Sequence, residues 1–277
     1  MNISKFLTSS VCVALLSSSL MASAHSESEN EGMCKGYGPQ TPRDIDSLFG
    51  ENKHLISIAP SYKNLNLCNI HFHENAEHKA KEFSIYAGDG EHGYDSGYQC
   101  SISKTLSPAE LKPTEEKICK GKHGDLVPGD TIEVHWVFTS CDIEPGKGLG
   151  SCVSDSCANP NLRVETQVFT LVNDSNALDF TKLTYDGNIV NGLHQPKAIP
   201  TNTGKSVEFI GSTTGPSYND YTKCSPYTAT WSVRPQCAKL DIKTIGQWCD
   251  GDNVFKEDHA HGVRKLVTDP KLLSEIK

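Results

Sequence analysis

Residues 69–78 have the sequence NIHFHENAEH, in which apolar and imidazole side chains alternate from Ile70 to His73. Side chains two residues apart lie on the same face of a β-strand, so Ile70 and Phe72 are expected to face a core while His71 and His73 share the opposite face. Two imidazoles on one face supply half of a tetrahedral zinc site. The stretch therefore predicts a β-strand that carries metal ligands.

A second alternating segment, residues 131–138 (TIEVHWVF), places Glu133 and His135 on one face of another predicted strand. Three imidazoles with one position left for water are typical of a catalytic rather than a structural zinc site. A zinc-bound imidazole needs an acceptor for its other N–H group, and Glu133 is suited to orient His135 in this way. Two separated strands are thus predicted to supply the ligands His71, His73 and His135.

Short apolar runs rich in β-branched and aromatic residues recur along the chain, separated by Gly and Pro clusters. They predict further strands at residues 83–86, 162–172, 206–210, 228–233 and 240–245. A short helix is predicted from Ser107 toward Lys117, where Ser107 and Glu110 form a capping box, and another at 271–276. The expected fold class is mostly β (α+β), a twisted central sheet with peripheral short helices.

The chain has 277 residues, with 26 Lys and Arg against 34 Asp and Glu, and 36% of its residues are hydrophobic. These figures fit one soluble globular domain with a sizeable core. The formal net charge of −8 gives no basic field for phosphates or anionic lipids, which disfavours nucleic-acid binding and attachment to a membrane surface. Small neutral or anionic substrates remain open, and so does assembly into an oligomer.

The first 24 residues combine an early lysine, an apolar stretch and the small-residue ending Ala22-Ser23-Ala24. This pattern predicts a signal peptide at 1–24 and a periplasmic or secreted protein, with no membrane insertion after cleavage. Residues 25–33 are polar and have nothing to bury, which predicts a disordered arm. Residues 34–277 are then predicted to form a single catalytic domain.

Eleven cysteines are present, and ten remain after the predicted cleavage. An even number in an oxidising compartment favours full pairing into disulfides, although the sequence alone leaves the connectivity open. A zinc site built on these thiols is disfavoured because no C-x-x-C spacing occurs. The cysteines are therefore interpreted as staples of the fold.

The histidine stretch and the opening segment 34–45 (CKGYGPQTPRDI) together resemble the delta class of carbonic anhydrases. The order of motifs is also similar to the alpha class, with a histidine pair on one strand, a Glu-His dipeptide soon after and Glu-x-His on a neighbouring strand. A Gly-Ser-x-Thr loop at 211–214, within the hydroxyl-rich turn 209–216 (FIGSTTGP), then leads to Cys224 and Trp231.

This resemblance implies a fold similar to that of the alpha carbonic anhydrases. It implies reversible hydration of carbon dioxide to bicarbonate and a proton by attack of a zinc-bound hydroxide. It also implies that Zn²⁺ is bound by His71, His73 and His135 and that Glu133 orients His135.

Glu77 and Thr214 are implied as the catalytic gatekeeping pair, with Thr213 in place of Thr214 if the loop register differs by one residue. In that pair the threonine hydroxyl donates to the carboxylate, which must stay ionised and can only accept. Two further pairs are implied, one lining the carbon dioxide pocket and one forming a disulfide: Val137 with Trp231, and Cys34 with Cys224.

Two other interpretations remain open. The H-x-H-x-x-x-E motif of cupins also fits, with Glu77 itself a ligand of iron or manganese and His135 the fourth. Against a cupin, the glycine expected seven residues after Glu77 is Ser84. The other alternative is an exported zinc-binding protein without turnover, which uses the same histidines.

The histidine that passes protons to buffer in the alpha class has no clear counterpart in this sequence. His54 is one option. His259 and His261 form another H-x-H near the end of the chain, but with no third ligand in sight they are interpreted as solvated.

Overall fold

The computed structural model describes residues 34–54, 56–213 and 224–277. The chain divides into two compact units, 1–35 and 36–277, and the second contains all the secondary structure given below. The predicted signal peptide, the predicted disordered arm and Thr214 lie outside the described residues. Their assignments, and that of a single domain, therefore stay predictions.

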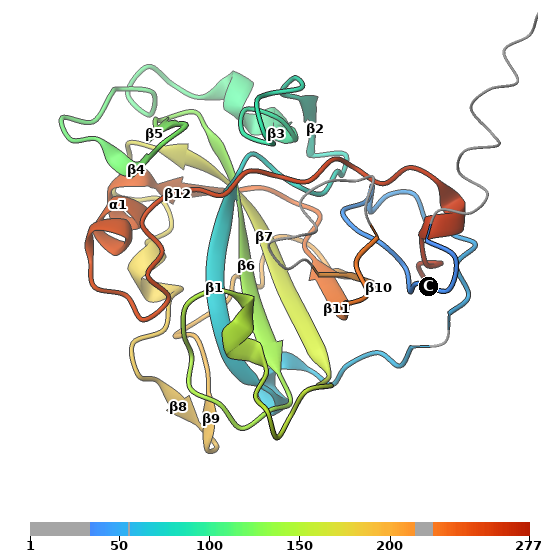
Figure 1. The fold of residues 1–277 in the computed structure, drawn as a ribbon. Helices are drawn as coiled ribbons and strands as arrows, with labels where there is room; N and C mark the ends of the chain where they lie inside the picture. The colour runs from blue at the N-terminus through green and yellow to red at the C-terminus, as the bar shows by residue number, and fades with distance from the viewer. Residues whose placement is uncertain (1–33, 55, 214–223) are drawn as a thin grey trace, which may run out of the picture. The chain divides into compact units, whose positions relative to one another are not determined.

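Residues 36–277 are organised around a mixed six-stranded sheet with the order β1-β6-β7-β11-β10, and β12 also pairs with β7 (Figure 1). Strands β1, β6 and β7 are antiparallel neighbours, whereas β7 pairs in parallel with β11 along its first half and with β12 along its second half. In chain order the strands are β1 (Asn66–Glu74), β6 (Thr131–Thr139), β7 (Leu162–Val172), β10 (Val207–Ser212), β11 (Thr228–Val233) and β12 (Ala238–Asp241).

Smaller elements surround this sheet. Other strands form two-stranded ladders, β2 (Phe83–Tyr86) with β3 (Tyr98–Cys100), β4 (Ile118–Gly121) with β5 (Gly124–Leu126), and β8 (Ile189–Val190) with β9 (Leu193–His194). Helix α1 (Ile242–Asp250) follows β12, and the short 3₁₀ helices are η1 (Tyr62–Asn64), η2 (Ser101–Thr105), η3 (Leu149–Cys152), η4 (Phe180–Lys182) and η5 (Pro270–Leu272). The predicted fold class, a mostly β chain with a central sheet and peripheral short helices, is confirmed. Within the described ranges, no helix has the length and apolar character that crossing a bilayer requires.

The two faces of the sheet bury different side chains. Ile70 and Phe72 of β1 and Trp136 of β6 are fully buried in one core, which α1 covers with its own apolar side chains. Val137 of β6 and Trp231 of β11 belong to a second core on the opposite face. Burying a side chain such as Phe72 contributes about 1.5–3 kcal/mol. The alternation along β1 and β6 therefore directs the three histidines to the face of the second core.

The prediction of a helix from Ser107 toward Lys117 is wrong. Its capping box forms, since the Ser107 N–H donates to Glu110 Oε2 at 2.8 Å and the Glu110 N–H to Ser107 Oγ at 3.3 Å. Only a turn over 108–111 follows. Pro113 explains the stop, because proline disfavours the helical conformation of the residue before it and has no N–H to continue the helix.

The segment 240–245, predicted as a strand, changes from strand to helix at Asp241. Its side chain caps α1 by accepting a hydrogen bond from the Lys243 N–H at 3.2 Å. The buried side chains of α1 recur at the helical spacing, a pattern that extends beyond this six-residue window: Ile242, Ile245, Trp248 and Cys249. The helix predicted at 271–276 is the short η5 instead.

Eight cysteines pair into four disulfides, Cys68–Cys152, Cys100–Cys237, Cys119–Cys249 and Cys141–Cys157. Cys68–Cys152 links η3 to β1 and Cys119–Cys249 links β4 to α1, so the interpretation of these cysteines as staples is confirmed. Cys34 and Cys224 are each disulfide-bonded. The pairing of these two with one another stays a prediction.

Replacing Asp241 by Ala removes the side-chain acceptor at the start of α1. We expect the free energy of unfolding to fall by about 1 kcal/mol, measured by urea denaturation. Asp241→Asn keeps an acceptor oxygen and serves as the control. Equal losses in the two variants would contradict the capping role.

Candidate functional site

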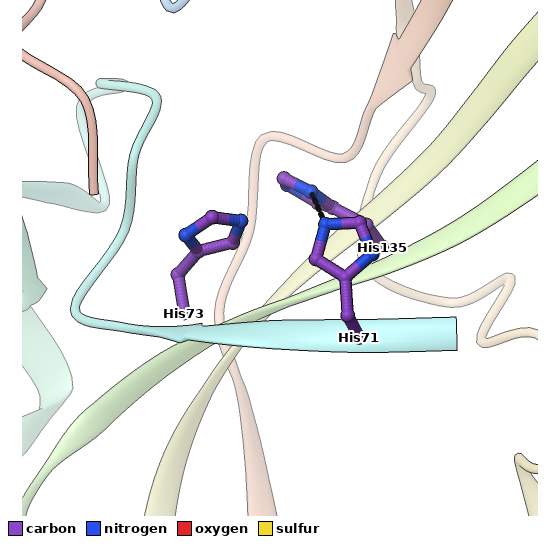
Figure 2. Close-up of side chains that lie close together, drawn as sticks. All are labelled: His71, His73 and His135. Carbon is purple, nitrogen blue, oxygen red and sulfur yellow. Dashed lines mark hydrogen bonds between the residues drawn. The ribbon is translucent and has the colours of Figure 1, made fainter. Parts of the chain in front are cut away.

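Strands β1 and β6 bring the three predicted ligands together, with His71 and His73 rising from the same side of β1 and His135 reaching them from β6 (Figure 2). His71 and His135 are direct partners in the antiparallel register, and His73 lies opposite Glu133. One nitrogen from each ring lies within 4.8 Å of the other two. The period of two along each strand and the pairing register together therefore build a three-histidine group.

Each imidazole of this group donates one N–H to an oxygen acceptor: His71 Nδ1 to Asn69 Oδ1 at 2.7 Å, His73 Nδ1 to the Gly262 carbonyl at 2.9 Å, and His135 Nε2 to Glu133 Oε1 at 2.7 Å. A carbonyl or carboxylate oxygen can only accept, so these bonds fix the tautomer of each neutral ring. The lone pairs that remain are on His71 Nε2, His73 Nε2 and His135 Nδ1.

The geometry of these remaining nitrogens tests whether a metal ion fits. His71 Nε2 and His135 Nδ1 lie 3.2 Å apart, the contact dashed in Figure 2. Because the protons of these two rings are on His71 Nδ1 and His135 Nε2, the lone pairs of the other two nitrogens face each other. This contact is unfavourable unless a cation lies between them. Nitrogen ligands at ~2.05 Å from a tetrahedral zinc ion are about 3.3 Å apart. The donor set therefore fits one metal ion held by three imidazoles.

The two imidazoles of β1 are held in the neutral form. Burial lowers the pKa of His71 well below its usual value, and the neighbouring His135 and His73 lower it further. Burial, with a smaller contribution from His135, lowers the pKa of His73 to about 4 against the opposing effect of Glu77. A neutral imidazole is the form that offers a lone pair to a metal.

Glu133 is a fully buried anion behind His135. Its Oε1 accepts from His135 Nε2 and from His78 Nδ1, each at 2.7 Å, and its Oε2 accepts from the backbone N–H of His78 at 3.0 Å. Burial alone would raise the pKa of Glu133, but His78 and His135 outweigh it and hold that pKa well below its usual range. His78 is thus a second donor to this carboxylate, which the sequence analysis did not assign.

Glu77 lies beside the histidine group, with a carboxylate oxygen within 4.8 Å of a His135 nitrogen. Its Oε1 accepts from Arg264 Nε at 2.6 Å. Burial raises the pKa of Glu77, but Arg264, followed by His73 and His135, lowers it to about 2. The carboxylate is therefore ionised at neutral pH, and Arg264 is a contact that the sequence analysis missed.

The two predicted pocket residues adjoin His135. Val137 follows it by two residues on β6, and the Trp231 ring lies 5.1 Å from its ring in an edge-on arrangement. Both side chains are 2% exposed. Trp231 Nε1 donates to the Ser212 carbonyl at 3.0 Å, which ties β11 to the end of β10.

The C-terminal segment 257–264 completes the site, and Figure 1 shows this part of the chain crossing the end of β1. The sequence analysis interprets His261 as solvated, and its side chain is 41% exposed, but its ring also lies beside the histidine group, 5.8 Å from that of His71 and 6.0 Å from that of His73. The same segment supplies the Gly262 carbonyl and Arg264. His54, the option for proton transfer, is exposed.

Comparison with known proteins gives one family. Residues 62–244, more than half of the chain, match the sequence model of a family described as Delta carbonic anhydrase. This range contains the three histidines, Glu77 and Glu133 but ends before the segment 257–264. No curated protein matches the chain.

Two solved structures are similar over most of their length. The complex of alpha-carbonic anhydrase from Thermovibrio ammonificans with the inhibitor sulfanilamide is 14% identical, with 82% of this chain and 84% of that chain covered and a TM-score of 0.29. A hyperthermostable carbonic anhydrase identified from an active hydrothermal vent chimney is 17% identical, with 84% and 86% covered and a TM-score of 0.27.

Replacing Glu133 by Gln removes the anion that accepts from both His135 and His78. We expect the affinity of the metal-free protein for zinc to fall about 10–100-fold, measured by competition with a chromophoric chelator. The control is Glu165→Gln, which removes a buried carboxylate paired with Arg163 on the opposite face of the sheet. Unchanged affinity in a folded Glu133→Gln variant would contradict the orienting role.

Proposed function

This chain belongs to the delta carbonic anhydrase family, and from that premise we propose that it hydrates carbon dioxide with one zinc ion held by His71, His73 and His135. The observation that carries the metal assignment is the convergence of three imidazole lone pairs whose other nitrogens are already bonded. Zinc, when bound, lowers the pKa of a water in its remaining position to about 7 and so supplies hydroxide at neutral pH.

The imidazoles and their acceptors hold the ion and fix the direction of each ring. Glu133 orients His135 through Nε2, so that Nδ1 stays aimed at the group. Asn69 and the Gly262 carbonyl do the same for the rings of β1. Acceptors of this kind fix the direction of each ring and raise the basicity of the ligands.

Glu77 acts as the fixed acceptor of a hydrogen-bond chain. An ionised carboxylate has no proton to give, so a hydroxyl beside it must donate to it. We assign that hydroxyl to Thr214, as the resemblance implies. The Thr214 oxygen is then free to accept a hydrogen bond from the hydroxide that attacks carbon dioxide. This bond fixes the direction of the attack.

Val137 and Trp231 supply the apolar wall on the side of His135. Carbon dioxide has no net charge or N–H and O–H groups, so an apolar surface accepts it without leaving polar protein atoms unpaired. Both side chains are buried in the second core.

An exported location is the third part of the proposal. Disulfides persist in oxidising compartments, and eight cysteines of this chain are paired in four of them. The pattern of residues 1–24 supports the same compartment. We infer a periplasmic or secreted enzyme.

His135→Ala removes one of the three lone pairs and is expected to lose both stoichiometric zinc and carbon dioxide hydration, measured by elemental analysis and stopped-flow assay of one sample. The control is His194→Ala, whose imidazole bonds to Tyr185 away from the group and should retain both. A folded His135→Ala variant that keeps stoichiometric zinc would refute the ligand set. Wild-type protein with zinc but no hydration would favour the alternative of a zinc-binding protein without turnover.

Glu77→Gln separates the proposed role from the cupin-type arrangement in which Glu77 is itself a ligand. We expect the variant to keep stoichiometric zinc and to lose at least about tenfold in kcat, because an amide can present a donor where only an acceptor works. Glu165→Gln is the matched control. Loss of zinc from Glu77→Gln would instead identify the carboxylate as a ligand.

A further inference from the structure

One guanidinium connects two parts of the site that the proposed function uses together. Arg264 Nε donates to Glu77 Oε1 at 2.6 Å, and Arg264 Nη2 donates to Thr41 Oγ1 at 3.2 Å. The side chains of Arg264 and Glu77 are 11% and 2% exposed, so water screens this ion pair little. Arg264 therefore holds a buried anion and the opening segment of the domain at the same time.

Thr41 extends this connection to Ser212, the last residue of β10. The Thr41 N–H donates to Ser212 Oγ at 3.1 Å, and the Thr41 hydroxyl donates to the Ser212 carbonyl. A hydroxyl has one proton, so with that proton given to Ser212 the Thr41 oxygen can only accept from Arg264. The hydrogen-bond chain thus has one direction, from Arg264 through Thr41 to Ser212.

We propose that Arg264 is a positioning residue that fixes the orientation of the Glu77 carboxylate and its distance from the end of β10. Because Arg264 binds Oε1 and also Thr41, the direction of the carboxylate is fixed relative to the end of β10. The planar guanidinium suits this role because its N–H groups lie in a rigid fork, whereas a lysine would supply the charge without the fork.

The position of Arg264 in the chain adds to this role. Two residues earlier, the Gly262 carbonyl accepts from His73 Nδ1. The same short segment therefore sets the direction of one ligand imidazole and the direction of the Glu77 carboxylate. Any shift of this segment along β1 would disturb both.

The proposal rests on the proposed function and has a consequence that turnover alone does not report. A fixed, ionised acceptor forces the neighbouring hydroxyl to accept from whatever occupies the metal, so ligands that carry a hydrogen on the bound atom are preferred. Hydrosulfide carries such a hydrogen and azide does not. If Glu77 loses its orientation, the preference for hydrosulfide over azide falls.

The test compares Arg264→Gln and Arg264→Lys with Arg163→Gln, all loaded with zinc. Arg163 is the matched control because it forms a buried ion pair with Glu165 on the opposite face of the sheet. We measure zinc content, kcat and KM for hydration, and the affinities for hydrosulfide and azide by calorimetry. Charged hydrogen bonds of this kind correspond to about a tenfold effect or more.

We expect Arg264→Gln to keep zinc, to lose about tenfold in kcat with little change in KM, and to lose about tenfold of its preference for hydrosulfide. Arg264→Lys should recover part of both, and Arg163→Gln should change neither. Wild-type kcat and ligand preference in Arg264→Gln would overturn the proposal, and so would equal losses in Arg163→Gln, because those would indicate a general effect of breaking a buried ion pair.

A second variant covers the case in which Arg264→Gln does not fold. Thr41→Val keeps the ion pair with Glu77 and the backbone N–H bond to Ser212 Oγ but removes the hydroxyl that links Arg264 to the Ser212 carbonyl, and it should lower kcat and the ligand preference in the same direction by a smaller factor. The proposal would be overturned if Thr41→Val kept the wild-type preference for hydrosulfide over azide while Glu77→Gln lost it. That result would leave the proposed function intact. Absence of zinc or hydration in the wild-type protein would instead refute the proposed function itself.

Discussion

The antiparallel register between β1 and β6 is the constraint on which the site depends. It places His71 directly opposite His135, and the same register buries Ile70 and Phe72 in the core on the other face. A slip by one residue would turn every side chain of a strand to the opposite face, taking Ile70 and Phe72 out of the core under α1 and His71 and His73 away from His135. The hydrophobic effect therefore fixes the alignment, and the close approach of the imidazole lone pairs, unfavourable by itself, is imposed by burial elsewhere in the same strands.

Charge explains why this arrangement suits a divalent cation. Two carboxylates lie next to neutral imidazoles, and both remain ionised although burial opposes it. Glu133 is stabilised by two imidazole N–H groups and Glu77 by Arg264, so neither anion lacks a partner. A divalent cation between three imidazoles would add positive charge close to both carboxylates and strengthen each His–Glu133 bond. The two ionised carboxylates thus bias the site toward a cation.

The sequence could predict the parts of the site that depend on local periodicity. It could not predict the parts that depend on contacts with residues far away in the sequence. The alternation of residues 69–73 and 131–138 was enough to place the three histidines and Glu133 on strand faces. Arg264 and the Gly262 carbonyl reach the site from 187 and 189 residues away, and no local pattern marks them. Two of the misassigned segments have local causes instead: Pro113 stops a helix from continuing one turn after the capping box of Ser107 and Glu110, and Asp241 starts a helix inside an apolar run that reads as a strand.

The segment that crosses the end of β1 joins the stability of the sheet to the geometry of the site. His261 takes the place of a neighbouring strand at this end of β1, since its N–H donates to the Phe72 carbonyl and its carbonyl accepts from the Glu74 N–H, each at 2.9 Å. An uncovered edge there would leave backbone groups free to pair with other chains. Because the Gly262 carbonyl and Arg264 follow directly, pairing that protects the edge also sets where His73 and Glu77 point. The closed edge and the orientation of the site therefore depend on the same few residues.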